Sequence, residues 1–251
     1  MFGDTGDTGA RGVPPPDDVL AGLLARAHRA VRAGDGPARA LPPDTVGLFG
    51  LDALTLSALT RDGRPELLWA DPPRGLGVEL DALQYAIGDG PVWQAAHEGR
   101  TVNEADLDTV DTARWPLFLP VVVDARARAR AVVALPLNIG SATIGVLTGY
   151  RVTPGPLTPD RLASLHHLAR ILLLALVTQL AVPADGTTAE GGLRVHHAEV
   201  HQATGYLASA LDIPLSQALL RLRAHAAGDG PITELARAFL THRLSPDTLQ
   251  R

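Results

Sequence analysis

Residues 88–100 read GDGPVWQAAHEGR, and this stretch contains both the start and the end of one short helix. Pro91 stands where a first helical residue belongs, because a fixed φ and a missing N–H do no harm there. Gly99 follows the last helical position and is the residue type that most often ends a helix. The stretch predicts a short helix between two glycine turns, and its neighbours can be placed on either side of it.

Upstream of this helix, the sequence alternates with a period of two, which is typical of half-buried strands. ALTLSAL (53–59) and ELLWA (66–70) alternate in this way, and RDGR (61–64) between them has the composition of a hairpin turn. VELDALQYAI (78–87) is a helical stretch that leads to the glycine turn. A β-hairpin followed by a helix is therefore expected before residue 88.

Downstream, RAVVALPL (130–137) and TIGVLTGYRV (143–152) predict a second strand pair across the loop NIGSA (138–142). Thr158, Pro159 and Asp160 then form a strong helix start, since Thr caps, Pro suits the first turn and Asp favours the positive helix end. That helix is expected to run to about Val182.

The chain divides into an α+β part and a helical part. Residues 1–16 are rich in Gly, Asp, Thr and Pro and are predicted to be a disordered tail; residues 17–182 are one α+β domain that opens with a helix. Residues 183–193 are a polar linker, and residues 194–246 carry three short apolar stripes at helical spacing. The predicted fold is an antiparallel sheet flanked by helices, followed by an all-α three-helix module.

Composition excludes several classes of function. The 251 residues contain no cysteine, which removes disulfides, thiolate metal sites and thiol nucleophiles, and which fits a reducing cytoplasm. The formal net charge of −5 gives no global attraction to nucleic acid or to an anionic membrane. The most apolar run, 171–182, is about 12 residues, short of the ~18 that span a bilayer. A soluble cytoplasmic protein with no membrane partner is expected.

The stretch GDGPVWQAAHEGRTVNEADL, the later RWP at 114–116 and the strand pair AVVALPLNIGSATIGVLTGY resemble a GAF domain over roughly residues 17–182. The resemblance implies a central antiparallel sheet with helices on its faces and, in many members, a pocket for a small effector. Many relatives have Cys after the G-x-G-P turn, where this chain has Val92. Methionine sulfoxide reductase activity and cysteine-linked bilin attachment are therefore excluded.

Residues 194–244 resemble an ANTAR domain, a three-helix RNA-binding module of transcription antitermination regulators. Four blocks in order carry the resemblance: QATG (202–205), LDIPLSQAL (211–219), RLRAHA (221–226) and ITELA (232–236). It implies a regulator whose GAF domain senses an effector and whose ANTAR module binds nascent RNA stem-loops, with two modules working together in a homodimer.

The candidate RNA-binding residues lie in two of these blocks: Gln202, Ala203, Thr204, Gly205, Arg221 and Arg223. Gly inside a helix costs about 1 kcal/mol against Ala, so Gly205 is either a close-packing point or a place where another molecule approaches. Arg221 and Arg223 are two positions apart and point in nearly opposite directions; at least one is expected to be solvated or paired with Glu199 or Glu234. Between Arg194 and Arg251 the sequence contains six arginines and five acidic residues.

Four large aromatic residues of the sensor half are candidates for an effector pocket: Trp69, Tyr85, Trp93 and Trp115. Filling the core is the alternative role for each of them. Trp93 is the strongest candidate for a pocket wall, because the resemblance puts the ligand cleft beside the G-D-G-P turn.

No cofactor, metal or catalytic constellation is predicted. His197 and His201 are one helical turn apart, but no third ligand accompanies them; no phosphate loop, Ser/His/Asp order or zinc protease motif occurs either. The chain is thus expected not to be an enzyme. Leucines from Leu165 to Leu180 form a stripe that predicts a dimer seam. The alternative reading is a protein-interaction or dimerisation protein whose degenerate GAF domain binds neither ligand nor RNA.

Overall fold

The computed structural model describes residues 16–124, 129–180, 198–230 and 232–249. At its centre lies an antiparallel sheet of five strands in the order β2-β1-β5-β4-β3. The strands are β1 (Ala53–Leu59), β2 (Pro65–Asp71), β3 (Val102–Glu104), β4 (Ala131–Ile139) and β5 (Ala142–Arg151). The sheet of two predicted strand pairs is confirmed, with β1 and β5 pairing at its middle.

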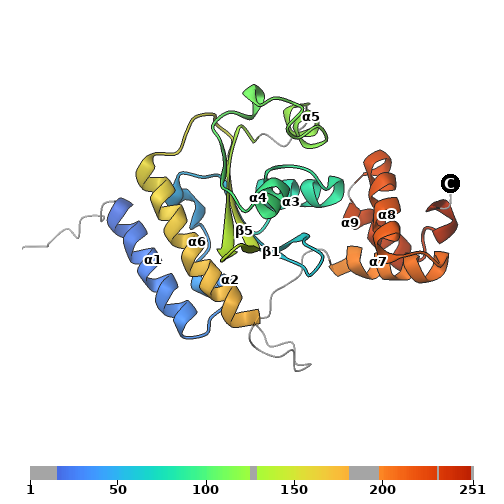
Figure 1. The fold of residues 1–251 in the computed structure, drawn as a ribbon, viewed down its shortest axis with the longest axis horizontal. Helices are drawn as coiled ribbons and strands as arrows, with labels where there is room; N and C mark the ends of the chain where they lie inside the picture. The colour runs from blue at the N-terminus through green and yellow to red at the C-terminus, as the bar shows by residue number, and fades with distance from the viewer. Residues whose placement is uncertain (1–15, 125–128, 181–197, 231, 250–251) are drawn as a thin grey trace, which may run out of the picture.

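Helices α1 (Pro16–Arg32) and α6 (Pro159–Leu180) cover one face of this sheet (Figure 1). Leu54 and Leu56 of β1 point into the core beneath them, and partly buried Ala58 packs against the same core. These alternating residues therefore share one face, but β1 and β2 are covered on both faces instead of being half-buried as expected. The chain passes from α1 to β1 through α2 (Pro37–Ala40) and the 3-10 turn η1 (Val46–Phe49).

The opposite face is covered by α3 (Leu76–Ile87), α4 (Pro91–Glu98) and α5 (Phe118–Asp124). A second core lies between these helices and the sheet. Helix α3 sits close to β1, since a Cβ added to Gly77 would lie 2.9 Å from Thr55 Cγ2. Gly88 (φ 70°) ends α3 and Gly90 (φ 123°) precedes α4, so the GDGP turn uses backbone conformations that favour glycine.

The C-terminal helices α7 (Ala198–Leu211), α8 (Leu215–Asp229) and α9 (Ile232–Leu240) share a third core, which the 3-10 turn η3 (Pro246–Leu249) closes. Their buried faces include Val200, Leu207, Leu222 and Phe239. Tyr85 of α3 also belongs to this core, so the helical module packs directly on the α+β domain. Figure 1 shows the module beyond α3 and α4, on the side away from α1 and α6.

Three expectations need correction or lie outside the structure. Strand β3 and helix α5 have no clear sequence signal, because three residues are too few to show a period of two and seven residues are only about two turns of a helix. The predicted loop 138–142 is shorter, since β4 runs to Ile139 and β5 begins at Ala142. Residues 183–193 and all of the predicted tail but Pro16 lie outside the described residues.

The leucines of the α6 stripe whose side chains the structure describes are not free to form a dimer seam. Leu165, Leu168, Leu172 and Leu176 are all buried between α1 and the sheet. Helix α6 is the one described helix long and apolar enough to cross a membrane by length and composition, and this internal packing accounts for its apolar character. A homodimer stays a prediction, and it would have to use another surface.

Candidate nucleic-acid interface

Of the four residues of the QATG block in α7, two are buried in the helical module and two reach its surface. Ala203 is fully buried, and buried Thr204 donates its hydroxyl to the Val200 carbonyl at 2.6 Å. Gln202 is exposed, and Gly205 and Tyr206 are half-buried. Two of the four predicted RNA-binding residues therefore support the core of the module, while Gln202 and Gly205 reach its surface.

Gly205 is not a close-packing point. A Cβ added to Gly205 would have no atom of another element within 4 Å, so nothing in the described chain requires a glycine there. Since mid-helix glycine costs about 1 kcal/mol, the open surface at this position is the more informative feature. It leaves room for a flat group from another molecule.

Next to Gly205, a pair of aromatic rings lies on the surface. Sequence patterns did not reveal this pair. The rings of Tyr206 and His242 meet edge to face, with centroids 5.6 Å apart and planes at 78°. His242 follows α9 in the left-handed region (φ 55°), which turns it toward α7, and exposed Arg243 comes next. Only the aromatic type of Tyr206 could have hinted at this, because the fold brings residues 36 positions apart together.

Arg221 lies on the side of α8 that contacts η3. Its Nη1 donates to the Leu249 carbonyl at 3.2 Å, and this contact ties η3 to α8. The expected partner Glu199 pairs instead with Arg237 at 2.9 Å. Arg221 is half-buried, so this candidate serves the module's own structure.

Arg223 points toward the sensor domain. Its guanidinium carbon lies 5.2 Å from the ring centroid of Tyr85 and 5.7 Å from that of Trp93, both within the range of a cation–π interaction. We call this group, Arg223 with the rings of Tyr85 and Trp93, the Arg223 stack. Arg223 Nε and Nη2 are buried and have no hydrogen-bond partner among the described residues. Burial accordingly lowers the pKa of the Arg223 guanidinium below its usual value.

A second polar contact joins the two parts of the chain. His201 Nε2 of α7 lies 2.6 Å from Oε1 of Glu66, a buried residue of edge strand β2. The hydrogen bond to Glu66 raises the pKa of His201, and burial opposes it. His201 therefore pairs across the domain boundary, while His197 lies outside the described residues. In the described part of the chain, no three His, Asp or Glu side chains gather as metal ligands.

Gln84 links the Arg223 stack to the centre of the sensor domain. Its Nε2 donates to the hydroxyl of Tyr150 on β5 at 2.8 Å, and its Oε1 accepts from Val92 N at 2.9 Å. The Gln84 carbonyl accepts from Trp93 Nε1 at 2.8 Å. One residue thus holds a core tyrosine, the start of α4 and one ring of the Arg223 stack.

The four predicted pocket aromatics do not meet in one cavity of the described structure. Trp69 packs in the core beneath α1 and α6, on the far face of the sheet from the other three. Trp115 is buried beneath α5 and donates Nε1–H to Gln94 Oε1 at 3.0 Å. Tyr85 and Trp93 come together, but around Arg223. This corrects the expectation of a shared effector pocket, and the alternative role as core residues holds for Trp69 and Trp115.

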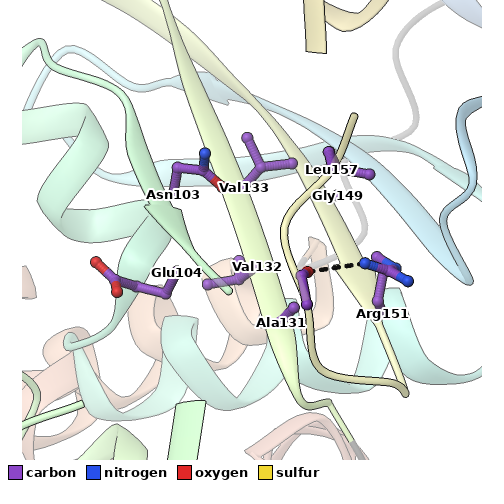
Figure 2. Close-up of a pocket in the computed structure, with 9 residues that line it drawn as sticks. Asn103, Glu104, Ala131, Val132, Val133, Gly149, Arg151 and Leu157 are labelled. Atoms are coloured by element: carbon purple, nitrogen blue, oxygen red, sulfur yellow. Dashed lines mark hydrogen bonds between the residues drawn. The ribbon is translucent and has the colours of Figure 1, made fainter. Parts of the chain in front are cut away.

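Cavities occur elsewhere. Figure 2 shows one where β3 and β5 end and β4 begins, and there Arg151 Nη1 donates to the Gly155 carbonyl at 2.8 Å. Its volume of about 10 Å³ is room for roughly one water molecule. A wider groove of about 850 Å³ lies between α6 and β4, with His166, His167 and Arg170 along its helix side. That volume falls in the range of small-molecule sites.

The comparisons with known proteins concern the sensor half. The family model of the GAF domain matches residues 17–176, so α7 to η3 lie beyond the match. A solved GAF domain of a phosphoenolpyruvate-protein phosphotransferase from Acinetobacter is 15% identical, with a TM-score of 0.49 over 67% of this chain and 99% of that one. The free methionine-R-sulfoxide reductase from Neisseria meningitidis is 18% identical, with a TM-score of 0.47 over 68% and 96%. No curated protein matches the chain.

Proposed function

The chain belongs to the GAF domain family, whose members are signal-sensing domains, and on that premise we propose that it is a cytoplasmic regulator whose C-terminal module binds RNA stem-loops. RNA binding would stabilise a hairpin that competes with a transcription terminator, so that transcription continues. The proposal assigns the chain no catalytic step. The sensor would respond to a small-molecule effector or to a partner and alter the RNA affinity of the module.

The observation that carries the proposal is the open surface at Gly205 beside the Tyr206–His242 pair. Proteins read RNA loops by stacking unpaired bases on aromatic rings or guanidinium planes and by bonding the base edges. Tyr206 and His242 offer ring faces and edges, and Gln202 offers an amide on the same face of α7. Exposed Arg243 follows His242 in the chain. The missing Cβ at Gly205 lets a flat base approach the helix backbone.

The proposed interface is small and only weakly basic. Each phosphate contact adds about 0.9 to the slope of log affinity against log salt, so few cations mean a shallow slope. We therefore expect affinity to depend more on the unpaired loop bases than on the phosphates. Two modules in a dimer would double the set of contacts.

Substitution of Gly205 by alanine tests the proposal. Gly205→Ala adds one methyl group to the open surface without disturbing any neighbour, so loop binding should weaken by about tenfold or more, the size of one lost base contact. Gly22→Ala in α1 is the matched control: it is also a helical glycine with room for a Cβ, but it lies in the sensor domain. Affinity of each variant for a stem-loop RNA and for the same stem closed by a scrambled loop is measured by electrophoretic mobility shift.

A protein-interaction module is the second candidate function. Leu215 and Leu220 of α8 are 62% and 65% exposed, which is unusual for large apolar residues on a small helical unit. If Gly205→Ala and Gly22→Ala both leave a weak, loop-independent RNA affinity unchanged, the exposed leucines become the better guide to function.

A further inference from the structure

We propose that the Arg223 stack is an autoinhibitory contact: RNA phosphate and the sensor domain compete for Arg223, and the docked arrangement is the state of low RNA affinity. This inference rests on the proposed function. It adds a mechanism of regulation, in which Arg223 is bound either by the sensor domain or by RNA phosphate.

The placement of Arg223 is the first argument. Its guanidinium lies over Tyr85 of α3 and Trp93 of α4, both in the sensor domain, rather than on the free surface of the module. A Cβ added to Gly88, in the turn between those helices, would lie 3.5 Å from Arg223 Nη1. The half-buried arginine therefore fits against the turn, and its Nε and Nη2 are shielded from RNA that approaches α8.

The unsatisfied hydrogen bonds of Arg223 are the second argument. Nε and Nη2 form the edge of the guanidinium that binds a phosphate or a carboxylate in a bidentate manner. In the docked arrangement both are buried against aromatic rings and lack acceptors among the described residues. A buried donor without an acceptor weakens the docked state, so a phosphate that offers two oxygens can compete with it.

The connection to the sensor core is the third argument. Gln84 holds the indole of Trp93 through its carbonyl and the hydroxyl of Tyr150 through its side chain. Tyr150 lies fully buried on β5, beneath the helices α3 and α4. A signal that shifts Tyr150 or α4 would move Trp93 and loosen the Arg223 stack, which couples the sensor core to the RNA affinity of the module.

A chemical cross-link tests the inference directly, because the chain contains no cysteine of its own. Asp62 in the β1–β2 turn and His201 on α7 are both exposed and lie near the start of β2. His201 contacts Glu66 of that strand, and Asp62 pairs with Arg64 just before it. Asp62→Cys with His201→Cys, joined by a short bismaleimide, fixes the docked arrangement. The same variant blocked at both thiols with N-ethylmaleimide is the matched control.

The cross-linked protein should bind the stem-loop about 5- to 100-fold more weakly than the blocked control, the usual range of coupling between sites. Its log–log salt slope should fall by about 1, because one phosphate contact is lost. Equal affinity and equal slope would overturn the inference and leave the proposed function standing. No loop-dependent binding by either form would overturn both.

A second set of variants releases Arg223 without a cross-link. Trp93→Leu removes one ring of the stack and keeps the arginine, so it should raise RNA affinity above that of the wild type. Adding Arg223→Gln to Trp93→Leu should abolish the gain. Trp69→Leu, a change of the same type on the far face of the sheet, controls for general loosening of the sensor domain. The inference fails if Trp93→Leu binds RNA no more tightly than Trp69→Leu.

Discussion

At the scale of single residues, Gln84 connects three parts of the sensor domain, and no sequence pattern near it indicates this role. Its side chain is buried and bonded to the Leu80 carbonyl, the Tyr150 hydroxyl and the Val92 N–H. Gln84→Leu would leave the last two without their partner in the interior. The free energy of unfolding should fall by about 2–4 kcal/mol, because each buried polar group left unpaired costs about 1–3 kcal/mol.

Urea unfolding followed by circular dichroism measures this loss. Gln202→Leu is the matched control, since Gln202 is exposed on α7 and the same substitution there should change stability by less than about 0.5 kcal/mol. A Gln84→Leu protein as stable as the Gln202→Leu protein would mean that the hydrogen bonds of Gln84 are not held in solution.

His201 gives the domain contact a pH dependence. The hydrogen bond to Glu66 raises the pKa of His201 above its ordinary 6.5, so the protonated form favours docking. The stabilisation is fully present below the ordinary pKa and is lost as pH rises through the raised value. Between about pH 6 and about pH 8, wild-type stability should therefore drop more than that of His201→Gln. His166 is an exposed histidine of α6, so the His166→Gln protein should keep the wild-type dependence of stability on pH. The same dependence in the His201→Gln protein would contradict the His201–Glu66 pair.

At the scale of elements, the two helical glycines separate stability from function. Gly22 of α1 and Gly205 of α7 both have room for a methyl group, so alanine at either position should raise stability by up to about 1 kcal/mol through helix propensity. Thermal and urea unfolding of Gly22→Ala and Gly205→Ala check this. Loss of stability in Gly205→Ala would show that α7 packs more closely there than the structure indicates, and the RNA test would then have to use another residue.

Glycine has the opposite meaning where α6 crosses β5. A Cβ at Gly145 would lie 2.7 Å from the Ser57 carbonyl oxygen and 2.8 Å from Leu176 Cδ1. Gly145→Ala should cost about 1–3 kcal/mol of stability, as overpacked cores do. Gly47→Ala, where no atom lies within 4 Å, is the control for urea unfolding. Equal stability of the two variants would mean that α6 is free to shift on the sheet.

Most of the longer elements could be predicted from the sequence, since α1, β1, β2, α3 and α4 each show a period or a cap of their own. The hydroxyl of Thr158, expected to cap α6, accepts from Arg161 N at 3.4 Å. The site could not be predicted in the same way. The Arg223 stack and the Tyr206–His242 pair depend on how α8 and α9 pack, and neither contact leaves a periodic trace in the chain.

At the scale of the whole molecule, the structure places the sensor and the helical module in contact through α3 and β2. The apolar stripe of α6, which the sequence suggested as a dimer seam, is buried inside the sensor core. A chain of contacts runs from Tyr150 through Gln84 to the Arg223 stack and so to α8, and this is the proposed route of coupling. Regulation by docking needs no second copy of the chain.

The affinity of the full chain for a stem-loop RNA, measured over a series of salt concentrations beside the same stem with a scrambled loop, tests the central claim most directly. We predict tighter binding to the stem-loop than to the same stem with the scrambled loop, a shallow salt slope, and weaker binding by Gly205→Ala than by Gly22→Ala. Equal and feeble binding to both RNAs would contradict the RNA-binding function and leave α7 to α9 as a module for protein contacts.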